Sequence, residues 1–171
     1  LITNPRDLRG FVRELERHRP AFMTGVNTLF NGLLHTPGFA RLDFGSLRVA
    51  LAGGMAVQED VARSWREVTG VVITQGYGLT EASPVVSANR LDIESFNGSV
   101  GLPFPSTDVL ILDESEQPVA ADEAGELCVR GPQVMKGYWQ RPEETAATFT
   151  AEGWLKTGDI ARMDADGRIY I

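Results

Sequence analysis

The chain has 171 residues, of which 43% are hydrophobic, so it can bury the core of one domain or of one domain plus a part of another. Its net charge of -7 argues against a nucleic-acid partner, because phosphate backbones are bound by clustered Lys and Arg. The longest apolar runs, such as residues 49–52, are too short to span a bilayer, and no signal-peptide pattern stands at the start.

The first third of the chain predicts a helix, a strand and a second helix. We expect Asn4 to cap the first helix with Pro5 at its first position, and apolar residues recur at helical spacing until Pro20. A short apolar stretch follows at residues 21–23, and a second helix is expected from about residue 27 to 35.

The next segment predicts a strand, a helix and another strand. A buried strand is expected at residues 47–51, a helix at 58–69 and a second buried strand at 71–74. This spacing is typical of a βαβ unit with parallel strands. Ligands bind at the carboxyl ends of such strands, which is where Gly53-Gly54 and Gly76-Tyr77-Gly78 fall.

From about Ser99 onward the pattern becomes β-rich. Turns are expected at residues 113–118 and 164–167, between strands at 108–112, 125–130 and 168–171. The predicted fold class is therefore α/β: a parallel βαβ layer in residues 1–98, followed by a small, partly antiparallel, barrel-like β subdomain in residues 99–171.

Two glycine-containing segments miss the common phosphate-binding motifs in an informative way. Residues 76–81 fail the dinucleotide fingerprint because Glu81 stands where the third glycine belongs, and its charge would repel a pyrophosphate. Residues 153–158 have the glycine spacing of a P-loop, but Asp159 replaces the lysine. Thr80 with Glu81 instead suits phosphate and Mg²⁺, and Asp159 suits the hydroxyl groups of a ribose.

Three segments, in this order, resemble motifs of the adenylate-forming superfamily, which includes acyl-CoA synthetases, luciferases and peptide-synthetase adenylation domains. The first motif is Tyr77-Gly78-Leu79-Thr80-Glu81. The second is residues 125–132 together with Gly137-Tyr138-Trp139, and the third is residues 153–159. The resemblance covers essentially the whole chain, so it implies that family's fold for the AMP-binding domain.

The resemblance also assigns roles. It implies that the nucleotide-binding residues are Gly53, Gly54, Gln75, Gly76, Tyr77, Gly78, Thr80 and Asp159. Within this set, Tyr77 is expected to stack on adenine and Asp159 to bind the ribose. Gln75 would lie near the amino edge of adenine, and the two glycines after the first βαβ strand would let the backbone approach adenine and the acyl carboxylate. Thr80 and Glu81 are the expected catalytic residues, with Thr80 on phosphate and Glu81 holding Mg²⁺.

The implied activity is ATP-dependent: a carboxylic acid is converted to an acyl-adenylate with release of pyrophosphate, and coenzyme A then captures the acyl group. Residues 49–56, 98–103 and 131–139 look most like bacterial long-chain fatty-acid CoA ligases, with a fatty acid as substrate. Two alternatives stay open. One is a ligase for medium-chain or aryl acids, and the other is a non-catalytic module that binds a nucleotide or a partner protein.

The chain starts at Leu1 without an initiator Met and stops within an expected strand at Ile171, so we expect an internal fragment. The family's phosphate loop and catalytic lysine would lie outside it, and the chain alone is expected to be inactive. Its one cysteine, Cys128, is expected to be a buried strand thiol and fits a reducing compartment. We expect a cytoplasmic protein, and leave open a peripheral position of the parent enzyme at the inner face of the membrane.

Other conspicuous side chains are expected to be structural. Lys136 and Lys156 do not lie where the family's catalytic lysine does, so solvated or secondary contacts are expected for both. Trp65, Trp139 and Trp154 are expected to be packing residues, with the alternative that Trp139 or Trp154 braces the neighbouring motif.

Overall fold

The computed structural model describes residue 4 and residues 6–171, which form two compact units. The first unit contains the residues up to Gln75 and the segment Arg90–Gly98, and the second contains Gly76–Asn89 and Ser99–Ile171. Strand β3 (Ile73–Gly78) runs from the first unit into the second. The expected domain boundary after residue 98 stays a prediction for the intact protein.

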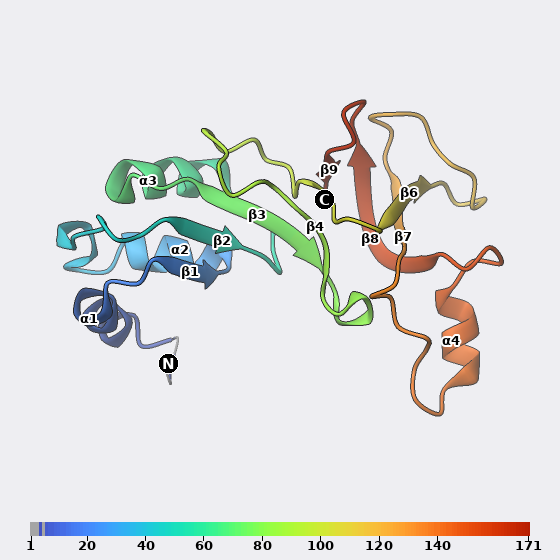
Figure 1. Ribbon diagram of the computed structural model, residues 1–171, viewed down its shortest axis with the longest axis horizontal. Coiled ribbons are helices and arrows are strands. Elements are labelled where there is room, and N and C mark those ends of the chain that lie inside the picture. The colour runs from blue at the N-terminus through green and yellow to red at the C-terminus, as the bar shows by residue number, and fades with distance from the viewer. Residues whose placement is uncertain (1–3, 5) are drawn as a thin grey trace. The chain divides into compact units, whose positions relative to one another are not determined.

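The first unit is built around parallel strands (Figure 1). Its other elements are α1 (Leu8–His18), β1 (Phe22–Gly25), α2 (Asn27–Leu34), η1 (Phe39–Arg41), β2 (Val49–Ala52) and α3 (Glu59–Thr69). Strand β2 pairs in parallel with β1 on one side and with β3 on the other, with Ala50 opposite both Met23 and Ile73. The predicted βαβ unit is confirmed.

The start of α1 differs from the prediction. Asp7 is its N-cap, and the Asp7 carboxylate accepts a hydrogen bond from the Gly10 N–H at 2.9 Å. The expected cap at Asn4 is wrong, because the Asn4 side chain instead accepts from the Arg6 N–H at 3.1 Å within the preceding turn. Pro5, expected at the first helical position, lies outside the described residues.

An aromatic cluster holds the helices of the first unit together. Phe30 from α2, Phe39 from η1 and Trp65 from α3 are fully buried. The ring centroids of Phe30 and Trp65 lie 4.8 Å apart in an edge-to-face arrangement, and those of Phe39 and Trp65 lie 5.3 Å apart. Such ring pairs each stabilise a core by about 1 kcal/mol beyond their buried area. The packing role expected of Trp65 is confirmed.

The second unit contains the end of β3 and two antiparallel arrangements. Its other elements are η2 (Thr80–Ala82), β4 (Val85–Ala88), β5 (Leu102–Pro103), β6 (Asp108–Leu112), β7 (Gly125–Arg130), α4 (Pro142–Thr148), β8 (Leu155–Met163) and β9 (Ile169–Tyr170). Strands β3, β4 and β5 pair in one arrangement, and β6 to β9 form a curled sheet in sequence order. The curled sheet is a half-barrel with β6 and β9 at its edges, so the predicted fold class is confirmed.

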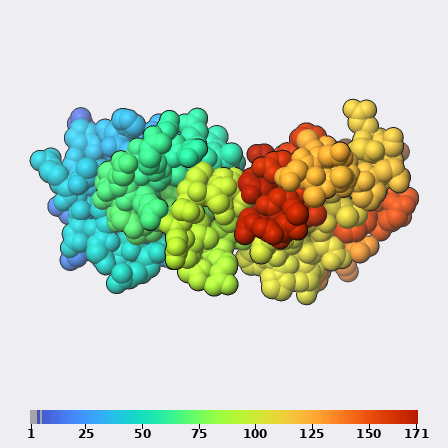
Figure 2. Space-filling model, turned by 90° about the horizontal axis from the view of Figure 1, so that it is seen from above, coloured from blue at the N-terminus to red at the C-terminus, as the bar shows by residue number. Residues whose placement is uncertain are grey.

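Both turns predicted in the β-rich part are present. Asp113 Oδ1 accepts from the N–H groups of Ser115 and Gln117, at 2.8 and 2.9 Å, and closes the first turn. Asp164 Oδ1 accepts from the N–H groups of Asp166 and Arg168, at 3.0 and 2.8 Å, and closes the second turn. This turn belongs to the C-terminal hairpin, whose red surface adjoins a yellow-orange surface in Figure 2, and the Asp122 N–H donates to the Met163 carbonyl at 2.9 Å.

Several features of the second unit were not predicted, among them the strands β4, β5 and β8. Strand β3 was expected to end at Thr74, but it continues to Gly78 because Gly76 and Tyr77 pair with β4. The predicted loop at Gln75–Glu81 is therefore mostly strand, followed by η2. Helix α4 was also missed, although Pro142 at its first turn is followed by two glutamates, which is a helix-start signal.

Candidate functional site

In the first unit, the turn after β2 is held to the middle of β3 by a buried amide. Gln75 is 3% exposed, and its Oε1 atom accepts from the Val57 N–H at 2.8 Å. The Gly53 N–H donates to the Gly25 carbonyl at 3.2 Å, and Gly54 has a φ of +76° that favours glycine. Gln75 thus fixes the backbone that follows Gly53-Gly54, at the carboxyl end of β2.

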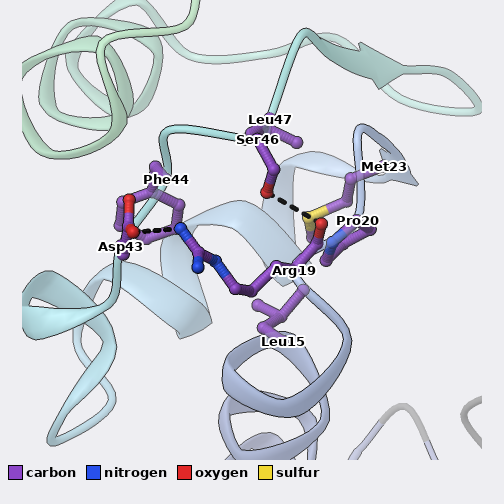
Figure 3. Close-up of a pocket in the computed structure, with 8 residues that line it drawn as sticks. All are labelled: Leu15, Arg19, Pro20, Met23, Asp43, Phe44, Ser46 and Leu47. Carbon is purple, nitrogen blue, oxygen red and sulfur yellow. Dashed lines mark hydrogen bonds and ion pairs between the residues drawn. The ribbon is translucent and has the colours of Figure 1, made fainter.

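A small cavity lies at the opposite end of these strands (Figure 3). Arg19 forms an ion pair with Asp43 at its mouth, and the Ser46 hydroxyl donates to the Arg19 carbonyl at 2.7 Å. The cavity has about 20 Å³ of free space, enough for one water molecule. Since Pro20 precedes β1 and Leu47 precedes β2, the cavity lies at the amino ends of the strands, where ligands of such sheets do not bind.

In the second unit, the first motif contacts the third. The Tyr77 hydroxyl at the end of β3 donates to Asp159 Oδ2 of β8 at 2.5 Å. Partial burial raises the pKa of Tyr77, and the hydrogen bond to the Asp159 carboxylate raises it further, so the phenol is the proton donor at neutral pH. Asp159 keeps its second carboxylate oxygen, Oδ1, for another donor.

The backbone of the third motif is fixed by the second motif. Gly158 has a φ of +77°, and its N–H donates to Glu126 Oε1 at 2.9 Å. The Thr157 hydroxyl donates to the Leu127 carbonyl at 2.7 Å, and the Asp159 N–H donates to the Thr157 hydroxyl at 3.2 Å. These contacts occur at an irregularity in the β7–β8 pairing, and they set the direction of the Asp159 side chain.

The second motif also contacts the first. The Tyr138 hydroxyl donates to Glu81 Oε1 at 2.8 Å, and the Met135 N–H donates to the Glu81 carbonyl at 2.7 Å. The hydrogen bond to Glu81 raises the pKa of Tyr138 above its usual range. Thr80 is exposed next to Glu81 in η2. A ring of hydrogen bonds therefore joins all three motifs in pairs.

A family model described as "AMP-binding enzyme" matches residues 2–139. The chain belongs to the AMP-binding enzyme family. This agrees with the superfamily indicated by the three motifs, and members of the family bind ATP or AMP.

Curated relatives of this AMP-binding chain are acyl-CoA ligases. The chain is 54% identical to the long-chain-fatty-acid–CoA ligase of Salmonella typhimurium over 171 residues, which is 100% of this chain and 30% of that protein. It is 39% identical to the feruloyl-CoA synthase of an Amycolatopsis species over 158 residues, 92% of this chain and 32% of that protein. The chain thus spans about a third of the length of these relatives.

Solved structures give the same grouping. The anthranilate CoA ligase in complex with anthranoyl-AMP matches with a TM-score of 0.90 and 29% identity, over 99% of this chain and 33% of that one. ATP-bound MatB from Rhodopseudomonas palustris matches with a TM-score of 0.86 and 30% identity, over 96% of this chain and 32% of that one.

The donor set of this AMP-binding chain fits a nucleotide-bound Mg²⁺ better than a protein-caged metal. Within the part of the chain that the structure describes, no three His, Cys, Asp or Glu side chains gather as a ligand set. The Glu81 side chain is partly exposed, and it supplies one carboxylate. The Tyr138 hydroxyl donates to its Oε1 atom, so Oε2 is left for a metal ion. Mg²⁺ commonly takes one or two carboxylates and completes its shell with phosphate oxygens and water.

The structure brings some predicted site residues together. Tyr77 contacts Asp159, and Thr80 and Glu81 are neighbours in η2, all within the second unit. Gly53-Gly54 and Gln75 belong to the first unit. There, the Val57 N–H, in the segment that follows Gly54, donates to the Gln75 side chain.

Sequence reasoning missed the contact of Tyr138 with Glu81, because the two residues are 57 positions apart and only their motif membership pointed to them.

Expectations for the remaining side chains were mostly correct. Lys156 forms an ion pair with Glu116 at 3.2 Å, which is the secondary contact expected of it. Cys128 is fully buried in β7, and burial raises the pKa of its thiol to about 11. Trp154 packs under the Arg130 guanidinium, 4.3 Å from its ring centroid, whereas the packing role expected of Trp139 is wrong, since that residue is 87% exposed.

None of the helices in the described part of the chain combines the length and hydropathy that crossing a membrane requires.

Proposed function

We propose that this chain is the nucleotide-contacting part of an ATP-dependent fatty acyl-CoA ligase. The observation that carries the proposal is the ring of hydrogen bonds among the three motifs. It places the Asp159 carboxylate beside Tyr77, and the Glu81 carboxylate beside Tyr138, although these residues come from distant parts of the chain. A nucleotide needs separate groups for base, ribose and phosphate, and this arrangement offers all of them.

The proposed roles follow from the chemistry of each group. The Tyr77 ring stacks on adenine, while Asp159 Oδ1 accepts hydrogen bonds from the ribose hydroxyls, because Oδ2 is taken by the Tyr77 phenol. The backbone at Gly76 and Gly78 lies beside the base, and Gly53 with Gly54 lets the main chain approach adenine and the acyl carboxylate. Gln75 lies near the adenine amino edge and also fixes the Gly53–Val57 turn.

Thr80 and Glu81 serve the first half-reaction, in which a carboxylate oxygen attacks the α-phosphorus of ATP and pyrophosphate leaves. The Thr80 hydroxyl donates to a phosphate oxygen, and Glu81 holds Mg²⁺. When bound, the metal neutralises part of the phosphate charge that repels the incoming carboxylate. These residues act by alignment and charge stabilisation, without a covalent enzyme intermediate. In the second half-reaction, the thiol of coenzyme A attacks the acyl carbonyl and AMP leaves.

The acid is proposed to be a long-chain fatty acid. This rests on similarity: identity is 54% to a long-chain-fatty-acid–CoA ligase over the full chain, against 39% to a feruloyl-CoA synthase. A medium-chain or aryl acid is the second candidate, because the solved neighbours include an anthranilate CoA ligase. We place the intact enzyme in the cytoplasm, or peripherally at the inner face of the membrane where its acyl substrate would partition.

The 171 residues alone are proposed to be inactive, since they span 30% of the Salmonella typhimurium relative. The third candidate is a non-catalytic module that binds a nucleotide or a partner protein. It predicts that the full-length protein releases no pyrophosphate with any acid.

The test is acyl-CoA formation by the full-length protein across a series of fatty acids from four to eighteen carbons, with benzoate and ferulate as aryl acids. We expect product to increase with chain length and the aryl acids to be poor substrates. Preference for short or aryl acids would contradict the long-chain assignment, and no pyrophosphate release with any acid would favour the non-catalytic module.

A further inference from the structure

Tyr138 is assigned no ligand in the proposed function, yet its side chain hydrogen-bonds the Glu81 carboxylate. Its hydroxyl donates to Glu81 Oε1 at 2.8 Å, so it occupies one oxygen of the carboxylate and leaves Oε2 free. The Met135 N–H, from the same segment, donates to the Glu81 carbonyl at 2.7 Å. Side chain and backbone of Glu81 are thus both held by residues 135–138.

Residue 138 is itself anchored to helix α4. The Tyr138 N–H donates to the Thr145 hydroxyl at 2.9 Å, and that hydroxyl donates to the Arg141 carbonyl at 2.7 Å. Gly137 makes this approach possible: a Cβ atom there would lie 2.5 Å from Thr145 Cγ2, and its φ of +148° favours glycine. A continuous set of contacts therefore runs from α4 through Tyr138 to Glu81.

We infer that Tyr138 is a positioning residue, anchored by Thr145, that holds the Glu81 carboxylate in the orientation needed for Mg²⁺. The inference rests on the proposed function, which makes Glu81 the metal ligand. A neutral phenol suits the task, since it can orient a carboxylate without cancelling its charge as Arg or Lys would. Groups that orient a metal ligand typically change metal affinity by about ten-fold or more when they are removed.

The experiment uses the full-length protein and measures ATP binding by calorimetry at graded Mg²⁺ concentrations, so that it does not depend on turnover. Tyr138→Phe removes the hydroxyl and keeps the ring. We expect the Mg²⁺ concentration for half-maximal ATP binding to rise about ten-fold, while ATP binding without Mg²⁺ is unchanged. Tyr170→Phe is the matched control, because it removes a phenol that donates to Asp164 at 3.1 Å, away from the three motifs.

Variants of Glu81 separate this inference from the proposed function. Glu81→Gln should raise the Mg²⁺ requirement at least as much as Tyr138→Phe, and the double variant should be no worse than Glu81→Gln alone. If Glu81→Gln raises the requirement but Tyr138→Phe behaves like Tyr170→Phe, the inference is wrong and the proposed function stands. If Glu81→Gln has no effect, the metal assignment fails, and the inference fails with it.

A second pair of variants keeps the test decisive if Tyr138→Phe lowers the melting temperature. Thr145→Val removes the hydroxyl that accepts from the Tyr138 N–H, whereas Thr145→Ser retains it. We expect Thr145→Val to raise the Mg²⁺ requirement about three-fold and Thr145→Ser to restore the wild-type value. Equal values for both variants would contradict the anchoring role of Thr145.

Discussion

Gly78 lies at the bulge where β3 meets β4, and no side chain fits there. A Cβ atom on Gly78 would lie 2.0 Å from the Pro84 carbonyl oxygen and 3.0 Å from Val85 Cα, and both are backbone atoms. That carbonyl accepts from the Leu79 N–H at 2.8 Å and closes the turn that contains Thr80 and Glu81. Gly78→Ala must therefore displace this turn.

The size of the effect follows from these contacts. Carbon and oxygen atoms rarely approach within about 3 Å, so the turn must move by roughly 1 Å, which disrupts the Leu79–Pro84 hydrogen bond. Losing that bond costs about 1 kcal/mol, and overpacking costs roughly 1–3 kcal/mol more. We expect Gly78→Ala to lower the free energy of unfolding by about 2–4 kcal/mol. Because a misplacement of about 1 Å can slow a reaction roughly 100-fold, pyrophosphate exchange should fall by that order.

Gly70→Ala is the matched control for this prediction. Gly70 ends α3 with a φ of +74°, and nothing lies within 4 Å of a Cβ atom placed there. The substitution therefore costs only the left-handed backbone conformation, about 1 kcal/mol, and should leave exchange unchanged. Urea denaturation and pyrophosphate exchange of the full-length variants measure both effects. If Gly78→Ala matches Gly70→Ala in both assays, the steric argument is refuted.

Four further outcomes are expected. Asp159→Ala should raise the KM for ATP by about 10- to 100-fold with a smaller change in kcat, as measured in steady-state assays, because a charge-assisted contact to the ribose is lost. Gln75→Met should lower the free energy of unfolding by about 1–3 kcal/mol in urea denaturation, because the buried Val57 N–H loses its acceptor. An unchanged midpoint of urea denaturation would contradict the role of Gln75 in fixing the turn after β2. Cys128, whose thiol pKa is raised to about 11 by burial, should not react with a thiol reagent at pH 8 until denaturant unfolds the protein. The pKa of Tyr77 is raised in the folded state, so above pH 10 its phenol ionises in the unfolded chain before it does in the folded one. The free energy of unfolding should therefore fall as pH rises above 10, and Tyr77→Phe should make that fall less steep in alkaline denaturation.

The parallel strands and turns could be predicted because their signals are local. The apolar runs before Gly53 and around Ile73 are bounded by glycines, and β2 and β3 occur there. The turn at residues 113–118 depends on the Asp113 side chain, which bonds the backbone two and four residues ahead.

Features that depend on distant partners could not be predicted in this way. Residues 76–78 contain two glycines and no apolar alternation, and they are strand because they pair with β4. The start of α1 was misplaced because Asn4 and Asp7 are both good caps, and only the structure shows that Asp7 accepts from the first turn of the helix. Trp139 lies in a motif, but its neighbours do not cover it, and a sequence window cannot report that.

The central claim is that Tyr77 and Asp159 together bind the adenosine of the acyl-adenylate. The most direct test is a crystal structure of the full-length protein with a non-hydrolysable acyl-adenylate. We predict that the adenine stacks on the Tyr77 ring and that Asp159 lies within hydrogen-bonding distance of the ribose hydroxyls. An adenosine bound away from both residues, with the phenol–carboxylate contact left as it is here, would contradict the account.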